Sequence, residues 1–353
     1  MTDGSAPHPT STGARRAHAV LITGAGGEIG HGLIEALHAR GGVDIVACDL
    51  RELEPELKAK CRDSFTGDIT DPAMIERLLA MYEIDTIYHL AALLSTRGEY
   101  NPEAAHQVNV QGTLNLLRLA GEQARSHGRH VTFVFPSSIA VYGMPSVPAK
   151  TDAGKVREDQ FLLPITMYGV NKLECEHLGR YYADHYRRLT QDKPTGRVDF
   201  RCVRFPGIIS AFTLPSGGTS DFAPEMLHAA AAGNPYTCFV RPDTRIPFMT
   251  MPDAVQALLT LADAPAKSLT TRVYNVGAFS PSAGEVVEIV KRAFPKADIT
   301  FKVDEARQGI VDSWPADVDD TKARRDWGYK PEHDLERAFA EYLIPNIRAR
   351  YGK

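Results

Sequence analysis

A short apolar segment at residues 19–22 runs directly into a glycine-rich turn, in which Gly24, Gly27 and Gly30 have the spacing GxxGxxG. A helical pattern follows over residues 28–40, and a second apolar segment comes after it at residues 43–48. A strand, a glycine turn, a helix and a second strand in this order predict a βαβ unit with parallel strands. Because parallel neighbours need a crossover that covers the sheet, this unit constrains the fold more than any other feature of the chain.

The alternation of strand and helix patterns continues beyond this unit. Further strands are predicted at residues 86–90, 131–135 and 198–203, and helices at residues 72–82, 103–126 and 166–189. Strands interleaved with helices predict an α/β fold, a Rossmann-type doubly wound parallel sheet that is covered on both faces. We expect residues 19–206 to form this domain.

The two ends of the chain depart from the alternation. Residues 1–18 are rich in Gly, Pro, Ser and Thr and are predicted to be a disordered N-terminal arm. After about Gly207 the order is less regular, with Pro and Gly clusters near residues 215–218 and 233–235. Residues 207–353 are therefore predicted to form mainly a smaller C-terminal substrate-binding lobe, with some returns to the main sheet.

The composition argues against several classes of protein. A formal net charge of -4 gives no indication of a nucleic-acid partner or an anionic membrane. No apolar run approaches the roughly 18 residues that span a bilayer, so we expect no membrane partner and a cytoplasmic location. The 5 cysteines lack CxxC spacing and the 12 histidines form no HExxH motif, so no metal site is predicted.

The glycine turn predicts a dinucleotide site. Gly24 allows a tight turn, Gly27 lets a pyrophosphate approach the backbone, and Gly30 lets the helix pack on the strand. Asp49 ends the second strand, where it can accept hydrogen bonds from the adenosine ribose and repel a 2′-phosphate, which selects NAD over NADP. The alternative is that Asp49 only caps the following turn. Asp68 could reach the adenine amino group or cap a helix that starts near residue 71.

A second group of residues predicts the chemistry. Tyr168 and Lys172 lie one turn apart on a predicted helix and share a face. A lysine ammonium beside a phenol stabilises the phenolate, so Tyr168 is predicted to act as a base near neutral pH. Ser138 can hold the substrate oxygen that loses the proton. Together with the dinucleotide site, these three residues predict an enzyme that moves a hydride to or from a nicotinamide.

Several motifs, in their order and spacing, resemble those of the extended short-chain dehydrogenase/reductases. The matching segments are TGAGGEIG at 23–30, GDITD at 67–71, HLAA at 89–92, NVQGTLNLL at 109–117, PSSIAVYG at 136–143 and YGVNK at 168–172. The resemblance covers nearly everything from Ala19 to the C-terminus. It implies that Ser138, rather than Ser137, is the catalytic hydroxyl that acts with Tyr168 and Lys172.

The same resemblance implies further contacts with NAD. The residues that would line the cofactor groove are Leu90, Ala91 and Ala92, with Asn109 stabilising the sheet and the groove. The residues that would lie beside the nicotinamide are Phe205, Pro206 and Ile208. The other expected cofactor contacts come from the two turns and are Glu28, Ile29, Asp68 and Ile69. Relatives commonly pair the helices near 103–126 and 166–189 across a two-fold axis, so a homodimer is expected.

Within this family, the substrate lobe is similar to that of the short-chain L-threonine 3-dehydrogenases. The similar stretches are AALLS at 91–95, RFPGIIS at 204–210, PSGGTSDFAPEM at 215–226 and RQGIVDSWP at 307–315. The similarity implies oxidation of the L-threonine 3-hydroxyl to 2-amino-3-oxobutanoate, with NAD accepting the hydride. The residues that would contact the amino acid are Ser95, Ser138, Tyr168, Gly218 and Thr219, with Trp314 closing over the site.

Two other functions stay open at this point. Arg97 departs from the pattern of this group: it is either a solvated loop residue or a group that holds a carboxylate or phosphate of another substrate. A nucleotide-sugar 4-epimerase or dehydratase would need cations near a diphosphate, and Arg241 and Arg245 could serve. A non-catalytic NAD-binding regulator is the third reading. The intact set of Ser138, Tyr168 and Lys172 argues against it, because a sensor needs no base.

Overall fold

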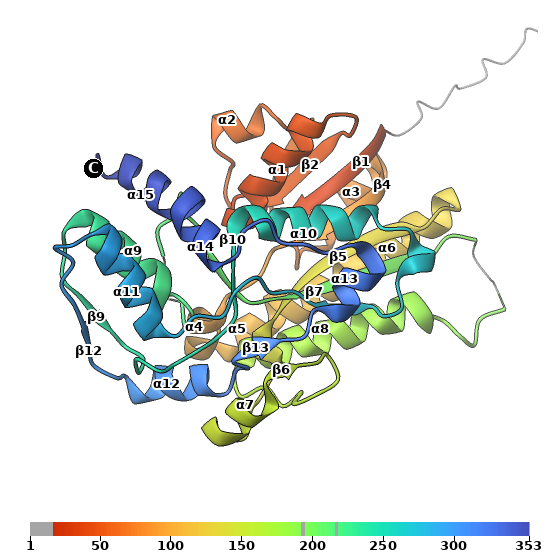
Figure 1. The fold of residues 1–353 in the computed structure, drawn as a ribbon. Helices are drawn as coiled ribbons and strands as arrows, with labels where there is room; N and C mark the ends of the chain where they lie inside the picture. The colour runs from red at the N-terminus through yellow and green to blue at the C-terminus, as the bar shows by residue number, and fades with distance from the viewer. Residues whose placement is uncertain (1–16, 192–194, 216–217, 353) are drawn as a thin grey trace, which may run out of the picture.

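Seven parallel strands form the central sheet of the structure, a computed structural model that describes residues 17–191, 195–215 and 218–352 (Figure 1). Apart from Ala17 and His18, the predicted N-terminal arm lies outside these residues. From one edge to the other the strands are β11 (Val273–Asn275), β7 (Val198–Phe205), β5 (Val131–Ser138), β4 (Tyr82–His89), β1 (Ala17–Thr23), β2 (Ile45–Asp49) and β3 (Asp63–Thr66). The predicted α/β fold with a doubly wound parallel sheet is confirmed.

The strand order reverses at β1, whose neighbours are β2 on one side and β4 on the other. The loops that leave β1 and β4 lead to helices on opposite faces of the sheet, which makes this a topological switch point at the carboxyl ends of the strands. In open α/β sheets this is where ligands bind.

Helices cover both faces of the sheet with apolar side chains. One face is covered by α1 (Glu28–Arg40), α10 (Met251–Asp263) and α13 (Thr321–Trp327). The other is covered by α3 (Pro72–Met81), α6 (Gly112–His127) and α8 (Met167–Asp184). Two of these helices, α10 and α13, come from the chain after residue 207, so the later part of the sequence helps to build the main layer.

Several elements differ from the sequence-based expectation. Helix α8 ends at Asp184 and not at the predicted residue 189. Strand β4 spans residues 82–89, whereas residues 86–90 were predicted. The helix predicted at 103–126 is interrupted, since α5 (Pro102–His106) continues through a π-helical turn at Gln107–Gln111 into α6. The edge strand β3 was not predicted because three of its four residues are polar and only Phe65 is buried. The opposite edge strand β11 has three residues, too few for a periodic pattern.

The C-terminal lobe lies beside the carboxyl ends of the strands, at the left of Figure 1. Its helices are α9 (Phe222–Ala232), α11 (Ala283–Ala293), α12 (Glu305–Asp312), α14 (Leu335–Arg337) and α15 (Ile344–Arg350), with a π-helical segment at Ala338–Leu343. Its strand pair is β9 (Tyr236–Cys238) with β12 (Ile299–Phe301). These elements share one apolar core with residues 139–144, which directly follow β5.

Short elements connect the lobe to the sheet. They are α4 (Ser95–Tyr100), α7 (Val147–Ala153), and the parallel pairs β8 (Gly207–Ile209) with β10 (Phe248–Thr250) and β6 (Lys155–Val156) with β13 (Asp317–Val318). The short helix α2 (Pro55–Lys58) lies apart from them, between β2 and β3. Within the described ranges, no helix has the length and apolarity to cross a membrane. The same residues contain no cluster of His, Cys, Asp and Glu suited to a metal ion.

Candidate active site

The glycine turn after β1 packs tightly against the end of β4. Gly24 has φ +69°, and a Cβ at this position would lie 2.5 Å from the backbone nitrogen of Ala91. A Cβ on Gly30 would lie 2.5 Å from the carbonyl oxygen of Ala25, so α1 approaches the turn closely. Gly27 is the N-cap of α1 and has no side chain to occupy the first amides of the helix. This backbone cradle at a helix N-terminus fits the pyrophosphate of a dinucleotide.

Asp49 lies beside this turn. One carboxylate oxygen accepts from the backbone nitrogen of Gly26 at 2.9 Å, and the other accepts from that of Arg51 at 3.2 Å. The side chain therefore caps the turn after β2 and also lies against the glycine turn, so the two sequence interpretations are compatible. Asp68 accepts from the Thr70 nitrogen at 2.8 Å, and it is Asp71 that caps α3.

The other residues predicted to bind NAD lie at or after the carboxyl ends of the strands. Both side-chain atoms of Asn109 bond to the backbone of Leu93, at 2.8 and 3.0 Å, which fixes the segment after β4. Asn109 comes from the π-helical turn, whose extra residue separates it from the regular helix. The remaining predicted residues follow the ends of strands: Glu28 and Ile29 after β1, Ile69 after β3, Leu90, Ala91 and Ala92 after β4, and Phe205, Pro206 and Ile208 at β7 and β8.

Ser138, Tyr168 and Lys172 come together where β5 ends and α8 begins. The Thr166 hydroxyl accepts from the Gly169 nitrogen at 3.1 Å and so starts α8 directly before Tyr168. The Ser138 hydroxyl lies close enough to that of Tyr168 to lower the pKa of the phenol. The Lys172 ammonium nitrogen lies 5.5 Å from the centre of the Tyr168 ring and donates to the carbonyl oxygen of Pro136 at 2.6 Å.

Burial dominates the acid–base properties of this group. It raises the pKa of Tyr168 well above the usual range of a phenol, and the hydrogen bond from Ser138 opposes this rise. Burial also lowers the pKa of Lys172 to about 8. The sequence predicted that the lysine would lower the pKa of the phenol, whereas in this structure burial raises it and Ser138 is the group that opposes the rise. Further positive charge beside Tyr168 is needed to make it a base near neutral pH.

Ser137 has a different environment from Ser138. Its hydroxyl donates to the carboxylate of Glu176 at 2.6 Å in the interior of the protein. Ser137 is therefore engaged in the interior, whereas Ser138 is half-buried, accepts from the Ala140 nitrogen at 3.2 Å and keeps its hydroxyl beside Tyr168. This arrangement supports the assignment of Ser138 as the hydroxyl that faces a substrate.

Two of the residues predicted to bind the substrate, Ser95 and Thr219, lie close to each other. Ser95 begins α4, and its hydroxyl lies 3.5 Å from that of Thr219. The next turn of α4 contacts the start of α8, because the Glu99 carboxylate accepts from the Met167 nitrogen at 2.8 Å. Arg307 donates to the Gly218 carbonyl at 2.8 Å and holds the loop. Ser216 and Gly217 of this loop lie outside the described residues.

Trp314 belongs to the apolar core against which Tyr168 also packs. It is 5% exposed and packs in the apolar core of the C-terminal lobe with Tyr142 and Met144. Its neighbour Asp312 forms a two-point ion pair with Arg241, at 2.8 and 3.0 Å. The segment predicted to close over the site is thus anchored within the lobe.

The cations considered for a diphosphate are paired with protein groups. Arg241 binds Asp312, and Arg245 forms an ion pair with Glu285 at 2.9 Å. Arg97 is exposed on α4. These pairings weaken the nucleotide-sugar interpretation, because a phosphate would have to compete with carboxylates already in contact.

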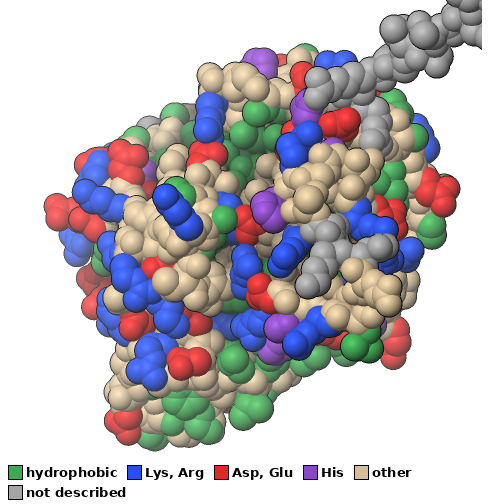
Figure 2. Space-filling view, turned by 90° about the vertical axis from the view of Figure 1, so that its right-hand side faces the viewer, with side chains coloured by type: hydrophobic (Ala, Val, Ile, Leu, Met, Phe, Trp, Pro, Cys, Tyr) green, Lys and Arg blue, Asp and Glu red, His purple; other side chains and the backbone are tan. Residues whose placement is uncertain are grey.

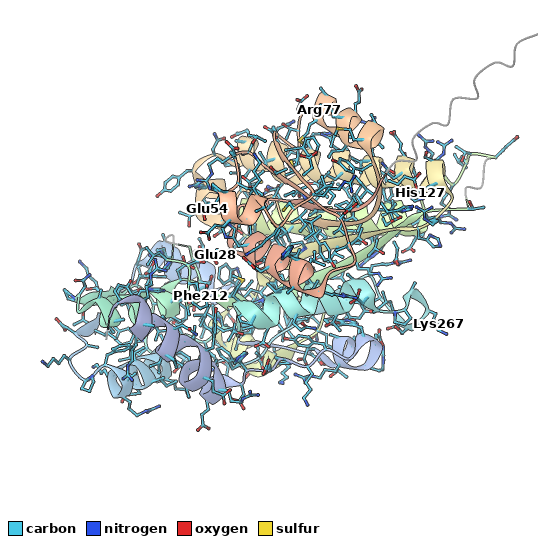
Figure 3. The ribbon with its side chains drawn as sticks, turned by 90° about the horizontal axis from the view of Figure 1, so that it is seen from above. Glu28, Glu54, Arg77, His127, Phe212 and Lys267 are labelled. Carbon is cyan, nitrogen blue, oxygen red and sulfur yellow. The ribbon has the colours of Figure 1, made fainter. Side chains whose placement is uncertain are left out.

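The start of α1 lies at the junction of the two parts of the chain. In Figure 3, Glu28 at the start of α1 lies next to Phe212 of the lobe. The hydroxyl of Thr213 hydrogen-bonds to the Glu28 carboxylate. Phe212 itself is 65% exposed at this junction. The residues that would hold the cofactor therefore meet the lobe directly.

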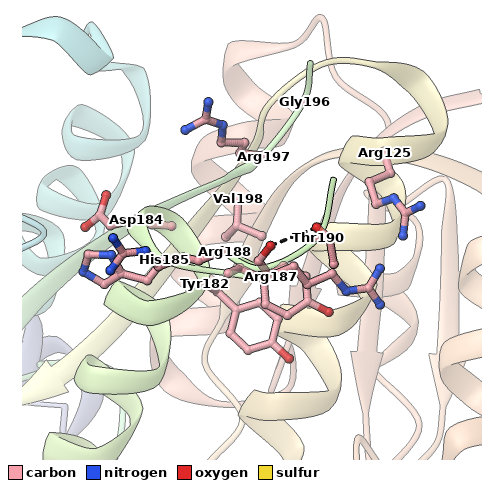
Figure 4. Close-up of a pocket in the computed structure, with 13 residues that line it drawn as sticks. Arg125, Tyr182, Asp184, His185, Arg187, Arg188, Thr190, Gly196, Arg197 and Val198 are labelled. Carbon is pink, nitrogen blue, oxygen red and sulfur yellow. Dashed lines mark hydrogen bonds between the residues drawn. The ribbon is translucent and has the colours of Figure 1, made fainter. Parts of the chain in front are cut away.

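A separate pocket of about 330 Å³ lies at the opposite end of α8 from Tyr168 (Figure 4). Its lining includes four arginines, which are Arg125, Arg187, Arg188 and Arg197. Residues of α6 and α8 also contribute to the lining. Figure 2 faces this end of the molecule and shows Lys and Arg side chains gathered around a hollow. The lining includes none of the predicted site residues.

Comparisons with known proteins agree with the fold and with the family inferred from the motifs. The model of the NAD dependent epimerase/dehydratase family matches residues 20–277. Mitochondrial L-threonine 3-dehydrogenase of Bos taurus is 37% identical over 329 residues, which cover 93% of this chain and 82% of that protein. The X-ray structure of L-threonine dehydrogenase from Clostridium difficile has a TM-score of 0.83 at 33% identity, covering 96% of this chain and 99% of the other. A monomeric L-threonine 3-dehydrogenase from a metagenome database, in its apo form, has a TM-score of 0.80 at 37% identity, with 94% and 99% covered. The resemblance inferred from the motifs is confirmed: the chain belongs to the NAD-dependent epimerase/dehydratase family.

Proposed function

We propose that this protein is an L-threonine 3-dehydrogenase, which oxidises the 3-hydroxyl of L-threonine to the ketone of 2-amino-3-oxobutanoate with NAD as the oxidant. The observation that carries the proposal is the contact between Ser95 and Thr219 at the start of α4, the helix that packs against Tyr168. Relatives that are 37% identical over nearly the whole chain and bear this activity in their names support the same substrate.

The glycine turn and Asp49 would hold NAD. The first amides of α1 would face the pyrophosphate, and the Asp49 carboxylate would accept from the ribose and repel a 2′-phosphate. We therefore propose NAD rather than NADP. Bound NAD supplies a positively charged ring that accepts the hydride from C3 of the substrate.

The residues of the chain handle the proton. Ser138 would hold the 3-hydroxyl in a hydrogen bond, and Tyr168 would remove its proton as the C3 hydride leaves. Burial raises the pKa of Tyr168, so the cationic form of Lys172 and the charge of the cofactor are both needed to favour the phenolate. A buried site makes each of these charges more effective than it would be in water.

The polar groups around the substrate suit a small zwitterion. Ser95, Ser138 and Thr219 supply neutral hydroxyls, which match a molecule whose net charge is zero. A nucleotide sugar would need free cations for its diphosphate, and Arg241 and Arg245 are already paired with carboxylates. A nucleotide-sugar 4-epimerase or dehydratase is the second candidate, supported only by the family.

The assembly and location of the protein are part of the proposal. Val170 and Tyr181 on α8 are 43% and 47% exposed, and they would be covered if α8 paired with its copy in a homodimer. We propose a cytoplasmic homodimer.

The test is the absorbance of NADH with L-threonine, L-serine and UDP-glucose, each with NAD. We expect NADH with L-threonine, and a kcat/KM with L-serine that is lower by about 10- to 200-fold, because the pocket gains from the extra methyl group. Conversion of the UDP-sugar without NADH from L-threonine would replace this proposal with the epimerase. NAD binding without turnover of any of the three would favour the regulator.

A further inference from the structure

Glu176 lies on the same face of α8 as the predicted catalytic residues. It follows Tyr168 by two turns and Lys172 by one turn, and it is 1% exposed. Its carboxylate accepts the hydroxyl of Ser137 at 2.6 Å. Ser137 is the residue directly before Ser138, so this buried contact is one residue away from the hydroxyl that would hold the substrate.

Arg204 fixes the plane of the Glu176 carboxylate. Its Nε and Nη2 atoms donate to the two carboxylate oxygens at 2.8 and 2.6 Å, and both side chains are 2% exposed. Arg204 lies on β7 directly opposite Ser137 on β5. It is held in turn by the hydroxyl of Tyr142 at 3.0 Å and the carbonyl of Glu158 at 2.8 Å. A two-point ion pair with further partners leaves the carboxylate little freedom.

The end of β5 is thus attached to α8 at three successive residues. The carbonyl of Pro136 accepts from Lys172, and the hydroxyl of Ser137 donates to Glu176. The third is Ser138, which bonds to Tyr168. The first two contacts are made by atoms that would not touch a substrate, and they determine where the third can form.

We propose that Glu176, held by Arg204, is a positioning residue that fixes the end of β5 against α8 through Ser137, and so sets the contact between Ser138 and Tyr168. This inference rests on the proposed roles of Ser138 and Tyr168. Its catalytic consequence follows from geometry, since a small displacement of a group that orients the substrate lowers the rate steeply.

The experiment compares Ser137→Ala and Ser137→Thr with a matched control. Ser137→Ala removes the bond to Glu176 without changing a charge, and Ser137→Thr restores a hydroxyl. The control is Asp199→Asn, which breaks a second buried ion pair on β7, that of Asp199 with Arg201 at 2.6 Å. Arg201 also binds the carbonyls of residues 261, 262 and 264, so this pair serves the attachment of α10 instead of the site.

The first readout needs neither substrate nor cofactor. With 3-fluorotyrosine at position 168, the ¹⁹F resonance reports the hydrogen bond from Ser138, and Ser138→Ala gives the resonance of the broken bond. We expect Ser137→Ala to move the resonance toward that of Ser138→Ala. Ser137→Thr should restore the original position, and Asp199→Asn should leave it unchanged.

The second readout is turnover. We expect Ser137→Ala to lower kcat for L-threonine by about 10- to 100-fold at unchanged affinity for NAD, and Glu176→Gln to lower it at least as much. If the resonance moves but no substrate is oxidised even by the unmodified protein, the positioning role stands and the proposed substrate fails. If Ser137→Ala keeps both the resonance and kcat, or if Asp199→Asn changes them equally, the positioning role is wrong.

Discussion

At the scale of single residues, Tyr168 carries the proposed proton transfer. Tyr168→Phe should lower kcat by on the order of 100-fold or more, because the general base is lost. NAD affinity, measured by titration calorimetry, should stay close to that of the unmodified protein. Tyr181→Phe on the same helix is the matched control, since this tyrosine is 47% exposed, and it should keep its rate. Substantial turnover in Tyr168→Phe would contradict the mechanism.

Asp49 decides the choice of cofactor at the same scale. Asp49→Ala removes the charge that would repel a 2′-phosphate, so the ratio of NAD to NADP in kcat/KM should fall, mostly through weaker use of NAD. The control is Asp44→Ala, which removes an exposed carboxylate near the start of β2 that is paired with Arg62. In Asp44→Ala, the ratio of kcat/KM with NAD to that with NADP should be unchanged. An unmodified protein that already prefers NADP would show that this role of Asp49 is wrong.

Site residues could be predicted from the sequence where they are close together along the chain, but not where tertiary contacts bring them together. Tyr168 and Lys172 are four residues apart, so the helix alone brings them to one face. The bond between Glu176 and Arg204 joins residues 28 apart, and it depends on the register of β7 with β5. Glu176, four residues after Lys172, was visible in the sequence as an acid on the same helix face. A glutamate on a helix is usually exposed to solvent, so its position alone did not predict a buried contact.

At the scale of elements, β1, β4 and α6 are joined by one buried histidine. The two ring nitrogens of His89 lie 2.8 Å from the Thr23 hydroxyl and 2.9 Å from that of Thr113. Burial, helped by the nearby charge of Lys172, lowers the pKa of His89 to about 3. Between about pH 6.5 and 3, the imidazole of His89 therefore binds a proton in the unfolded chain but not in the folded chain. The free energy of unfolding must fall as the pH falls through this range.

This gives a pH prediction with a defined sign. The free energy of unfolding should fall by up to about 1.4 kcal/mol per pH unit below pH 6 from this group. His89→Asn should lose that part of the dependence, whatever its stability at pH 7. Urea denaturation at pH 5 and pH 7 measures it, with the exposed His177→Asn as the control. If the free energy of unfolding falls by the same amount from pH 7 to pH 5 in His89→Asn and in the unmodified protein, His89 is not the cause of the pH dependence.

Elements were predictable from the sequence where they are long and periodic. Helix α1 has the predicted bounds, because a glycine precedes it and its apolar residues recur with helical spacing. The π-helical turn that carries Asn109 leaves no such trace, since its residues continue a helical pattern. The edge strands β3 and β11 are stabilised by their neighbours, and their own sequences carry too little pattern to identify them.

At the scale of the whole molecule, the proposed dimer can be tested on α8. Val170→Glu combined with Tyr181→Glu places two charges where the copies would meet, so the double variant should dissociate to a monomer. Met81→Glu on α3, 45% exposed, is the matched control and should leave the assembly unchanged. Light scattering at micromolar concentration measures both. A monomeric unmodified protein would reject the dimer, and a relative named as monomeric makes this a real outcome.

The late origin of α10 and β11 has a consequence for how the chain is made. Helix α10 packs against α1 and covers the sheet, and β11 completes its edge, yet both are encoded after α9 and β9 of the lobe. While the ribosome has released only the first 206 residues, buried side chains such as Val134 and Phe205 lack the cover that α10 gives in the complete fold, and α1 covers only part of that face. Translation must therefore pass residue 275 before the sheet can close. The half of the protein that would hold NAD matures only when much of the other half has been synthesised.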